Sequence, residues 1–267
     1  METHLLSIWI LLIAAGMGAG VVAGLLGLGG GAIVVPLLVF LAPALHIPPQ
    51  FVMPSAVATS LVVVVFASLR ALSRQSQRRT VLSHGWPLLL GAIVGAAVTG
   101  WWLPRHPTTH WLTAFGVFEI LIAWHMVRAL PPPSRDRCAL ALPPWNNLVG
   151  ATIGSISTAF GIGGGSLTVP YLLLGRGWPM LPSVTLSNAV GAALAVAALP
   201  GFLTTPGPGW GMVLPEVAAA LVLGALIAAP WGVKLGKRLP EQRTRQIFAI
   251  ILGVIGLRLI AKGVGLG

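Results

Sequence analysis

The chain has 267 residues, of which 56% are hydrophobic and only 8% are charged, and its mean hydropathy is +0.91. This composition excludes an ordinary soluble domain and predicts an integral membrane protein. The formal net charge of +11 comes from basic residues in short loops beside apolar runs. Orientation in the membrane and contact with anionic membrane lipid explain these charges, so we expect no nucleic-acid partner.

Eight apolar segments follow one another along the chain, at lengths that suit helices crossing about 30 Å of hydrocarbon. They lie at residues 5–42, 54–72, 84–103, 110–130, 145–175, 183–204, 212–235 and 246–262. None shows the apolar/polar alternation of a membrane barrel strand, so the predicted class is an all-α membrane protein. The first and fifth segments are too long for one plain helix, and each has a glycine-rich middle. We therefore expect both of these helices to be broken there.

The two glycine-rich stretches belong to an internal repeat. Residues 16–38 align without a gap with residues 150–172. The identical pairs are Gly16/Gly150, Gly20/Gly154, Gly27/Gly161, Gly29/Gly163, Gly30/Gly164, Gly31/Gly165, Val35/Val169, Pro36/Pro170 and Leu38/Leu172. Since most of these are glycine or proline, the repeated feature is a backbone conformation. Its recurrence deep in the chain indicates that the first segment is part of the mature protein and not a signal peptide.

The match continues beyond the glycines, because residues 54–60 resemble 182–188 and residues 91–93 resemble 224–226. We therefore divide the chain into a first transmembrane repeat at 1–130, a proline-rich charged linker at 131–144 and a second transmembrane repeat at 145–267. The linker is expected to be cytoplasmic, since it carries arginines.

Corresponding loops of the two repeats carry opposite charge bias. The loop near 70–83 holds four arginines whereas its counterpart at 204–212 has no basic residue, and the loop near 104–109 holds one arginine whereas its counterpart at 234–245 has five basic residues. Because Lys and Arg accumulate in cytoplasmic loops, this pattern predicts two inverted-topology repeats of about four helices each, with both termini periplasmic. An inverted repeat requires that each half cross the membrane an odd number of times. The broken first helix supplies the odd number, because its two pieces either both cross the membrane or together form a re-entrant hairpin.

A helix break inside a membrane is tolerated only where protein covers it or where it lines a wet cavity. The half-helix that follows a break presents free N–H groups and the positive end of its dipole, which suits an anion. We interpret six glycines as two unwound substrate-binding turns near the midplane: Gly29, Gly30, Gly31, Gly163, Gly164 and Gly165. Four further residues are expected to shape the breaks: Gly27, Pro36, Gly161 and Pro170. Close helix packing explains the other repeated glycines, namely Gly16, Gly20, Gly91, Gly95, Gly150 and Gly154.

Neutral polar residues near the breaks complete the predicted site. They are Thr59, Ser60, Ser166, Ser187 and Asn188, whose hydroxyl and amide groups can bind an anion without a buried counter-charge. Ordinary hydrogen bonding between helices, or back to their own helix, is the alternative. Glu119 is the one acid well inside an apolar segment. It is a candidate for proton coupling or, alternatively, a protonated carboxyl bonded to a neighbouring helix.

The sequence contains no His/Cys/Asp/Glu spacing typical of a metal site and no plausible pairing of nucleophile and base. We therefore expect no metal, no cofactor and no enzymatic activity. The sequence does not determine whether the protein is a monomer or a homo-oligomer.

Four stretches resemble the duplicated motifs of the TauE/SafE family of sulfite exporters and related permeases: "GLLGLGGGAIVVPLL", "AFGIGGGSLTVPYLL", "SAVATSL" and "TLSNAVGA". The resemblance extends over nearly the whole chain. It implies a secondary carrier in the bacterial cytoplasmic (inner) membrane that moves sulfur-containing anions such as sulfite or organosulfonates, usually outward. A passive anion channel and a non-transporting membrane subunit of a larger complex are the alternatives. Which anion moves, in which direction and with which coupling ion is not determined by the sequence.

Overall fold

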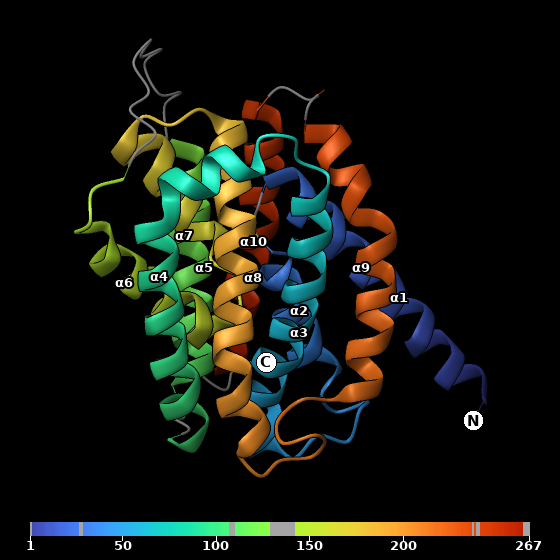
Figure 1. The fold of residues 1–267 in the computed structure, drawn as a ribbon. Helices are drawn as coiled ribbons and strands as arrows, with labels where there is room; N and C mark the ends of the chain where they lie inside the picture. Colours follow the sequence, from blue (N-terminus) through green and yellow to red (C-terminus); the bar gives the residue numbers. More distant parts are fainter. Residues whose placement is uncertain are drawn as a thin grey trace.

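A computed structural model describes residues 2–26, 29–106, 110–128, 142–236, 238 and 241–263. Gly27 and most of the predicted linker lie outside the described residues. Within the described ranges the chain forms ten α-helices, so the predicted all-α class is confirmed (Figure 1). These are α1 (Glu2–Leu26), α2 (Gly31–Leu41), α3 (Val52–Ser73), α4 (Arg78–Trp102), α5 (Trp111–Arg128), α6 (Asn146–Phe160), α7 (Gly165–Pro170), α8 (Met180–Thr204), α9 (Pro215–Gly236) and α10 (Glu241–Gly263).

Five stretches of the described chain are helical, long and apolar enough to cross a membrane. They are Ile8–Leu25, Pro49–Ser73, Arg78–Arg105, Met180–Thr204 and Pro215–Gly236. Large apolar side chains also point outward from the bundle, for example Val98 on α4 and Ile227 on α9. Such a surface suits hydrocarbon, because contact with lipid tails removes the cost of exposing apolar groups to water.

The two predicted helix breaks are confirmed. The first lies between α1 and α2, and the second between α6 and α7. The backbone φ angle is 69° at Gly29 and 76° at Gly30, and it is 66° at Gly163 and 77° at Gly164. Only glycine adopts this left-handed conformation routinely, which explains why the repeat conserves glycine at both places within one chain.

Glycines let α1 and α9 pack closely and in parallel. A Cβ added to Gly16 would overlap the backbone of Leu221, and one added to Gly20 would lie 2.5 Å from the carbonyl oxygen of Ala225. The contact positions advance in the same direction along both helices, so the two helices run parallel. The predicted packing role of these glycines is confirmed.

The pair α4 and α6 is built in the same way. Gly91 meets the backbone of Asn147, and Gly95 meets that of Ala151. These contacts again advance together, so α4 and α6 also run parallel. By contrast, α5 and α10 are antiparallel, since Gly116 lies beside Gly256 while Gly263 lies beside Thr113.

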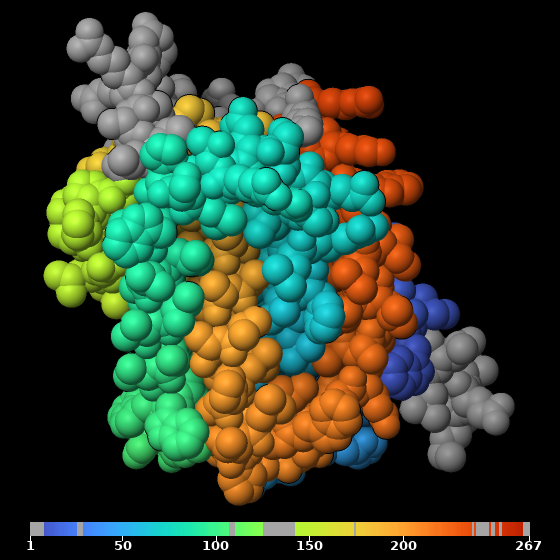
Figure 2. Space-filling model, in the orientation of Figure 1, coloured from blue at the N-terminus to red at the C-terminus, as the bar shows by residue number. Residues whose placement is uncertain are grey.

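Figure 2 shows α4, α8, α3 and α9 side by side on one face of the molecule, with the turn between α3 and α4 across its upper end. The segment between α8 and α9 lies at the lower end in Figure 1, as does the beginning of α1. In this row α3 and α8 are central, and both are largely buried. The paired breaks lie against these two helices.

We predict that Gly16→Ala lowers the stability of the protein, because the added methyl group forces α1 away from the Leu221 backbone. Overpacking of this kind costs about 1–3 kcal/mol. Gly18 is the matched control on the same helix, since nothing lies within 4 Å of its added Cβ. Thermal unfolding in detergent should therefore show a lower melting temperature for Gly16→Ala and an unchanged one for Gly18→Ala. Equal melting temperatures for the two variants would contradict the packing role.

Candidate functional site

The two helix breaks lie against each other. A Cβ added to Gly29 would be 3.0 Å from the Cα of Gly163, and one added to Gly163 would be 3.0 Å from the Cα of Gly29. Gly31 packs in the same way on the carbonyl oxygen of Gly161. Gly31 and Gly165, which the sequence predicted as part of the unwound turns, are instead the first residues of α2 and α7. We therefore call residues 29–30 and 161–164 the paired turns. The structure thus brings together the two glycine stretches that the sequence predicts as one site.

Each of the paired turns begins a short helix. The first bond within α2 is donated by the amide of Ile33 to the carbonyl oxygen of Gly30, at 3.1 Å. The first bond within α7 is donated by Leu167 to Gly164, at 3.2 Å. The two amides ahead of each of these donors have no acceptor inside their own helix. The positive ends of two short helices therefore meet in the protein interior.

One face of α3 packs along the paired turns. Ser60 donates a hydrogen bond to the carbonyl oxygen of Gly161, at 2.8 Å. One turn later, Val64 lies against both turns, with its Cγ1 3.2 Å from an added Cβ at Gly29 and 2.9 Å from one at Gly163. Ser60 therefore binds the edge of the second break directly, and Val64 fills the space between the two breaks.

Ser68 extends the same face of α3 by another turn. It is fully buried, and its hydroxyl has no hydrogen-bond partner among the described residues. Its oxygen lies 3.2 Å from an added Cβ at Gly191, whose backbone packs on the Gly163 carbonyl. Ser68 is not among the site residues predicted from the sequence. Its position eight residues after Ser60, two turns along one helix face, was the signal that could have found it.

The facing side of α8 carries Asn188 and Ser187, both fully buried. Asn188 lies about one turn before Gly191 and donates from Nδ2 to the carbonyl oxygen of Val184, at 3.0 Å. Its Oδ1 has no partner within the described part of the chain. An amide oxygen left unpaired in the interior is costly. Asn188 Oδ1 can therefore still accept a hydrogen bond, either from a ligand or from a group that moves toward it.

Other predicted site residues have different surroundings. The Thr59 hydroxyl accepts a hydrogen bond from the amide of Leu214, at 3.1 Å, so it faces the start of α9. Ser166 is buried in the first turn of α7. Three further buried hydroxyls around the second break have no partner among the described residues: those of Ser157, Thr158 and Thr168.

Glu119 lies on the interface between α5 and α10. It is 2% exposed, and neither carboxylate oxygen has a partner among the described residues. Its Cβ is 3.3 Å from an added Cβ at Gly256 of α10. On the same helix, Phe115 stacks on Phe160 of α6 and Phe118 packs against it at a tilt. Glu119 is therefore buried among apolar groups and separate from the α3 and α8 faces that meet the paired turns.

Comparison with known proteins agrees with this architecture. Residues 12–259 match the family described as "Sulfite exporter TauE/SafE". The chain belongs to this family. It is a family of membrane transporters and not of enzymes, so this TauE/SafE protein is a multi-pass membrane protein with a transport function.

Three relatives of this TauE/SafE protein are each called a "Probable membrane transporter protein". The one from Haemophilus influenzae is 27% identical over 95% of this chain and 98% of its own length. The one from Bacillus subtilis, YunE, is 25% identical over 96% of this chain and 98% of its own. The one from Methanocaldococcus jannaschii is 27% identical over 97% of this chain and 98% of its own. No solved structure matches the chain.

We predict that Gly163→Ala destabilises the paired turns. Alanine in the left-handed conformation costs roughly 1–2 kcal/mol, and the new methyl group would lie 2.9 Å from Val64. Gly175→Ala is the matched control, because Gly175 is exposed and its added Cβ would be 3.4 Å from Tyr171, an ordinary contact. In a detergent melting experiment only Gly163→Ala should unfold at lower temperature. A wild-type melting curve for Gly163→Ala would show that the turn conformation is not required.

Proposed function

We propose that this TauE/SafE protein is a secondary transporter, an exporter, of small sulfur-containing anions such as sulfite or organosulfonates. It would work by alternating access around the paired turns. The observation that carries the proposal is the backbone contact between Gly29 and Gly163, which joins two helix breaks from distant parts of the chain. Broken helices with their N-terminal ends at a shared central point are a recurring way for carriers to hold an anion inside a membrane.

The proposal includes an inverted repeat in which each half is the upside-down copy of the other. Two features support it: the aligned motifs of the sequence, and the directions of the packed helices. In the repeat alignment α6 corresponds to α1 and α4 corresponds to α9. The parallel pair α1 and α9 would thus have the parallel pair α6 and α4 as its symmetry mate. Counterparts α5 and α10 run antiparallel, as inversion requires.

The membrane orientation follows from the charges within this proposal. Arg74 lies in the turn between α3 and α4, Arg78 and Arg79 begin α4, and Lys234 lies in the last turn of α9. These ends would face the cytoplasm of a bacterial inner membrane, and both chain termini would face the periplasm. Each half then crosses five times when its broken helix is counted as one helix and one returning half-helix.

Neutral donors would bind the substrate in the proposed site. The buried Ser68 hydroxyl has no partner among the described residues, at a cost of roughly 1–3 kcal/mol. Asn188 Nδ2 carries two hydrogens, of which the bond to the Val184 carbonyl uses one. An anionic oxygen would accept hydrogen bonds from the Ser68 hydroxyl, from the second Nδ2 hydrogen of Asn188 and from the first backbone amides of α2 and α7. Since Gly31 packs on the Gly161 carbonyl, the half-helices would have to part for the substrate to enter.

Glu119 would couple transport to protons in this scheme. An ionised carboxylate on the α5–α10 interface would lose its hydration without gaining a cation among the described residues. A proton taken up or released there would change the contact between α5 and α10. The packing of α5 on α6 through Phe160 offers a route to the second break.

We predict that Asn188→Leu raises the substrate concentration needed for half-maximal flux of radiolabelled sulfite and of a simple sulfonate in proteoliposomes. Removing one hydrogen bond to an anion weakens binding by about 10-fold to 100-fold. Thr185→Val is the matched control on α8, because the Thr185 hydroxyl only bonds back to Leu181 of its own helix, at 2.8 Å. The melting temperature of Asn188→Leu should not fall, which separates a lost site from a lost fold.

In the same experiment, the concentration dependence of flux through the wild-type protein distinguishes a carrier from a channel. Flux that rises linearly with concentration and never saturates would indicate a passive anion channel. Absence of flux with every anion tested would favour a subunit that does not transport by itself. Wild-type flux in Asn188→Leu would contradict the proposed position of the substrate.

We predict that Glu119→Gln keeps substrate flux but makes it insensitive to an imposed pH gradient, since glutamine cannot bind or release a proton. Glu216→Gln is the control, because Glu216 is exposed at the start of α9 and should retain the wild-type response. The measurement is the ratio of initial flux with and without the gradient. A ratio in Glu119→Gln equal to that of wild type would exclude Glu119 from coupling.

A further inference from the structure

A cavity of about 290 Å³ lies at the end of the bundle where α1 and α9 finish and α8 begins. This is the same end as the turn between α3 and α4. The lining residues are Gly24, Leu25, Gln75, Met180, Leu181, Val184, Val233 and Gly236. All of them except Gln75 are glycine or apolar, so the cavity has an apolar wall with one polar group.

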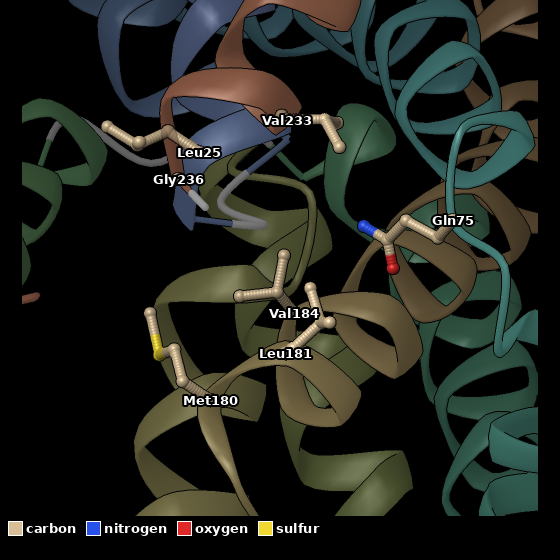
Figure 3. A pocket seen from close by; sticks show the side chains of 8 residues that line it. Leu25, Gln75, Met180, Leu181, Val184, Val233 and Gly236 are labelled. Carbon is tan, nitrogen blue, oxygen red and sulfur yellow. The ribbon is translucent and has the colours of Figure 1, made fainter. Parts of the chain in front are cut away.

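Gln75 lies two residues after the end of α3 and is only 6% exposed. Neither its Nε2 nor its Oε1 has a hydrogen-bond partner among the residues that the structure describes. Figure 3 shows its amide pointing toward the space between Val184 and Val233. A buried amide of this kind is stabilised when a ligand supplies the missing partner.

Positive charge stands beside this cavity. Arg74 precedes Gln75 in the chain and Lys234 follows Val233, and both side chains are exposed. Two cations next to an opening raise the local concentration of small anions. The apolar wall, in turn, favours a ligand that carries hydrocarbon.

We propose that this cavity is a binding site for small amphiphilic anions, in which Gln75 is a specificity-determining residue. A short hydrocarbon body would lie against Leu181 and Val184, and an oxygen of the acid group would accept a hydrogen bond from Gln75 Nε2. An inorganic anion has no apolar part and leaves the wall uncovered. Any transport of a ligand bound here rests on the proposed function, whereas the binding itself does not.

Isothermal titration of the protein in phosphatidylcholine nanodiscs tests the site. The probes are a series from methanesulfonate to pentanesulfonate, with sulfite for comparison. Affinity should rise about fourfold for each added methylene, as expected for burial of hydrocarbon. Sulfite binding that Gln75→Leu weakens as much as it weakens pentanesulfonate binding would overturn the proposal, as would equal affinity along the series.

Gln75→Leu should weaken binding of pentanesulfonate by about tenfold, since the bond to the acid group is lost. Its melting temperature should not fall, because the amide it removes has no partner among the described residues. Gln77→Leu is the matched control, as Gln77 is exposed on the same turn and should leave binding unchanged. Wild-type affinity in Gln75→Leu would overturn the role of this residue.

A second variant, Val184→Trp, tests the cavity itself, because the larger side chain fills it. This variant should lose pentanesulfonate binding and keep the binding of any anion held elsewhere. A phospholipid that native mass spectrometry finds bound, and that pentanesulfonate does not displace, would overturn the proposal.

Flux in proteoliposomes distinguishes this proposed site from the proposed transport function. Flux without alkanesulfonate binding refutes this site and leaves the transporter, whereas binding without flux refutes the proposed function and leaves the site.

Discussion

Hydrocarbon offers no water to an unpaired backbone group, so a helix that breaks inside the bundle must have its break covered by protein. In this protein each break covers the other. Gly29 lies on Gly163, Gly31 lies on the Gly161 carbonyl, and Ser60 donates a hydrogen bond to that same carbonyl. A side chain at these contact points would hold the two backbones apart. The glycines are therefore required by the contact as well as by the left-handed conformation.

Close glycine contacts also hold the surrounding helices in place, since lipid tails are as apolar as the side chains and give helices little hydrophobic reason to associate. The pair α1 and α9 and the pair α4 and α6 each join helices that other helices separate in the sequence. Between them lie α3 and α8, which carry the polar faces next to the paired turns.

Among the described residues, the buried polar side chains are almost all neutral. The groups nearest the paired turns are hydroxyls and an amide, and those of Ser68 and Asn188 keep unused hydrogen-bonding capacity within the described part of the chain. Gln75 repeats this arrangement at the end of the bundle, where it faces an apolar cavity. Glu119 is the exception, an acid buried at a helix interface away from these groups. Neutral groups bind and release an anion with less change in electrostatic energy than a buried cation would allow.

Composition and periodicity in the sequence determined that the protein is helical, lies in a membrane and breaks two of its helices, because hydropathy, glycine and proline act locally on the backbone. Family membership follows from the same glycine motifs. Only the tertiary structure decided which breaks touch and which polar groups share a face with them. Ser68 lies in the candidate site, Thr59 faces the start of α9, and Glu119 lies away from the paired turns. Helix rotation and packing between distant segments set where each of these side chains points. The Gln75 cavity likewise depends on four helix ends meeting, and no local pattern specifies such a meeting.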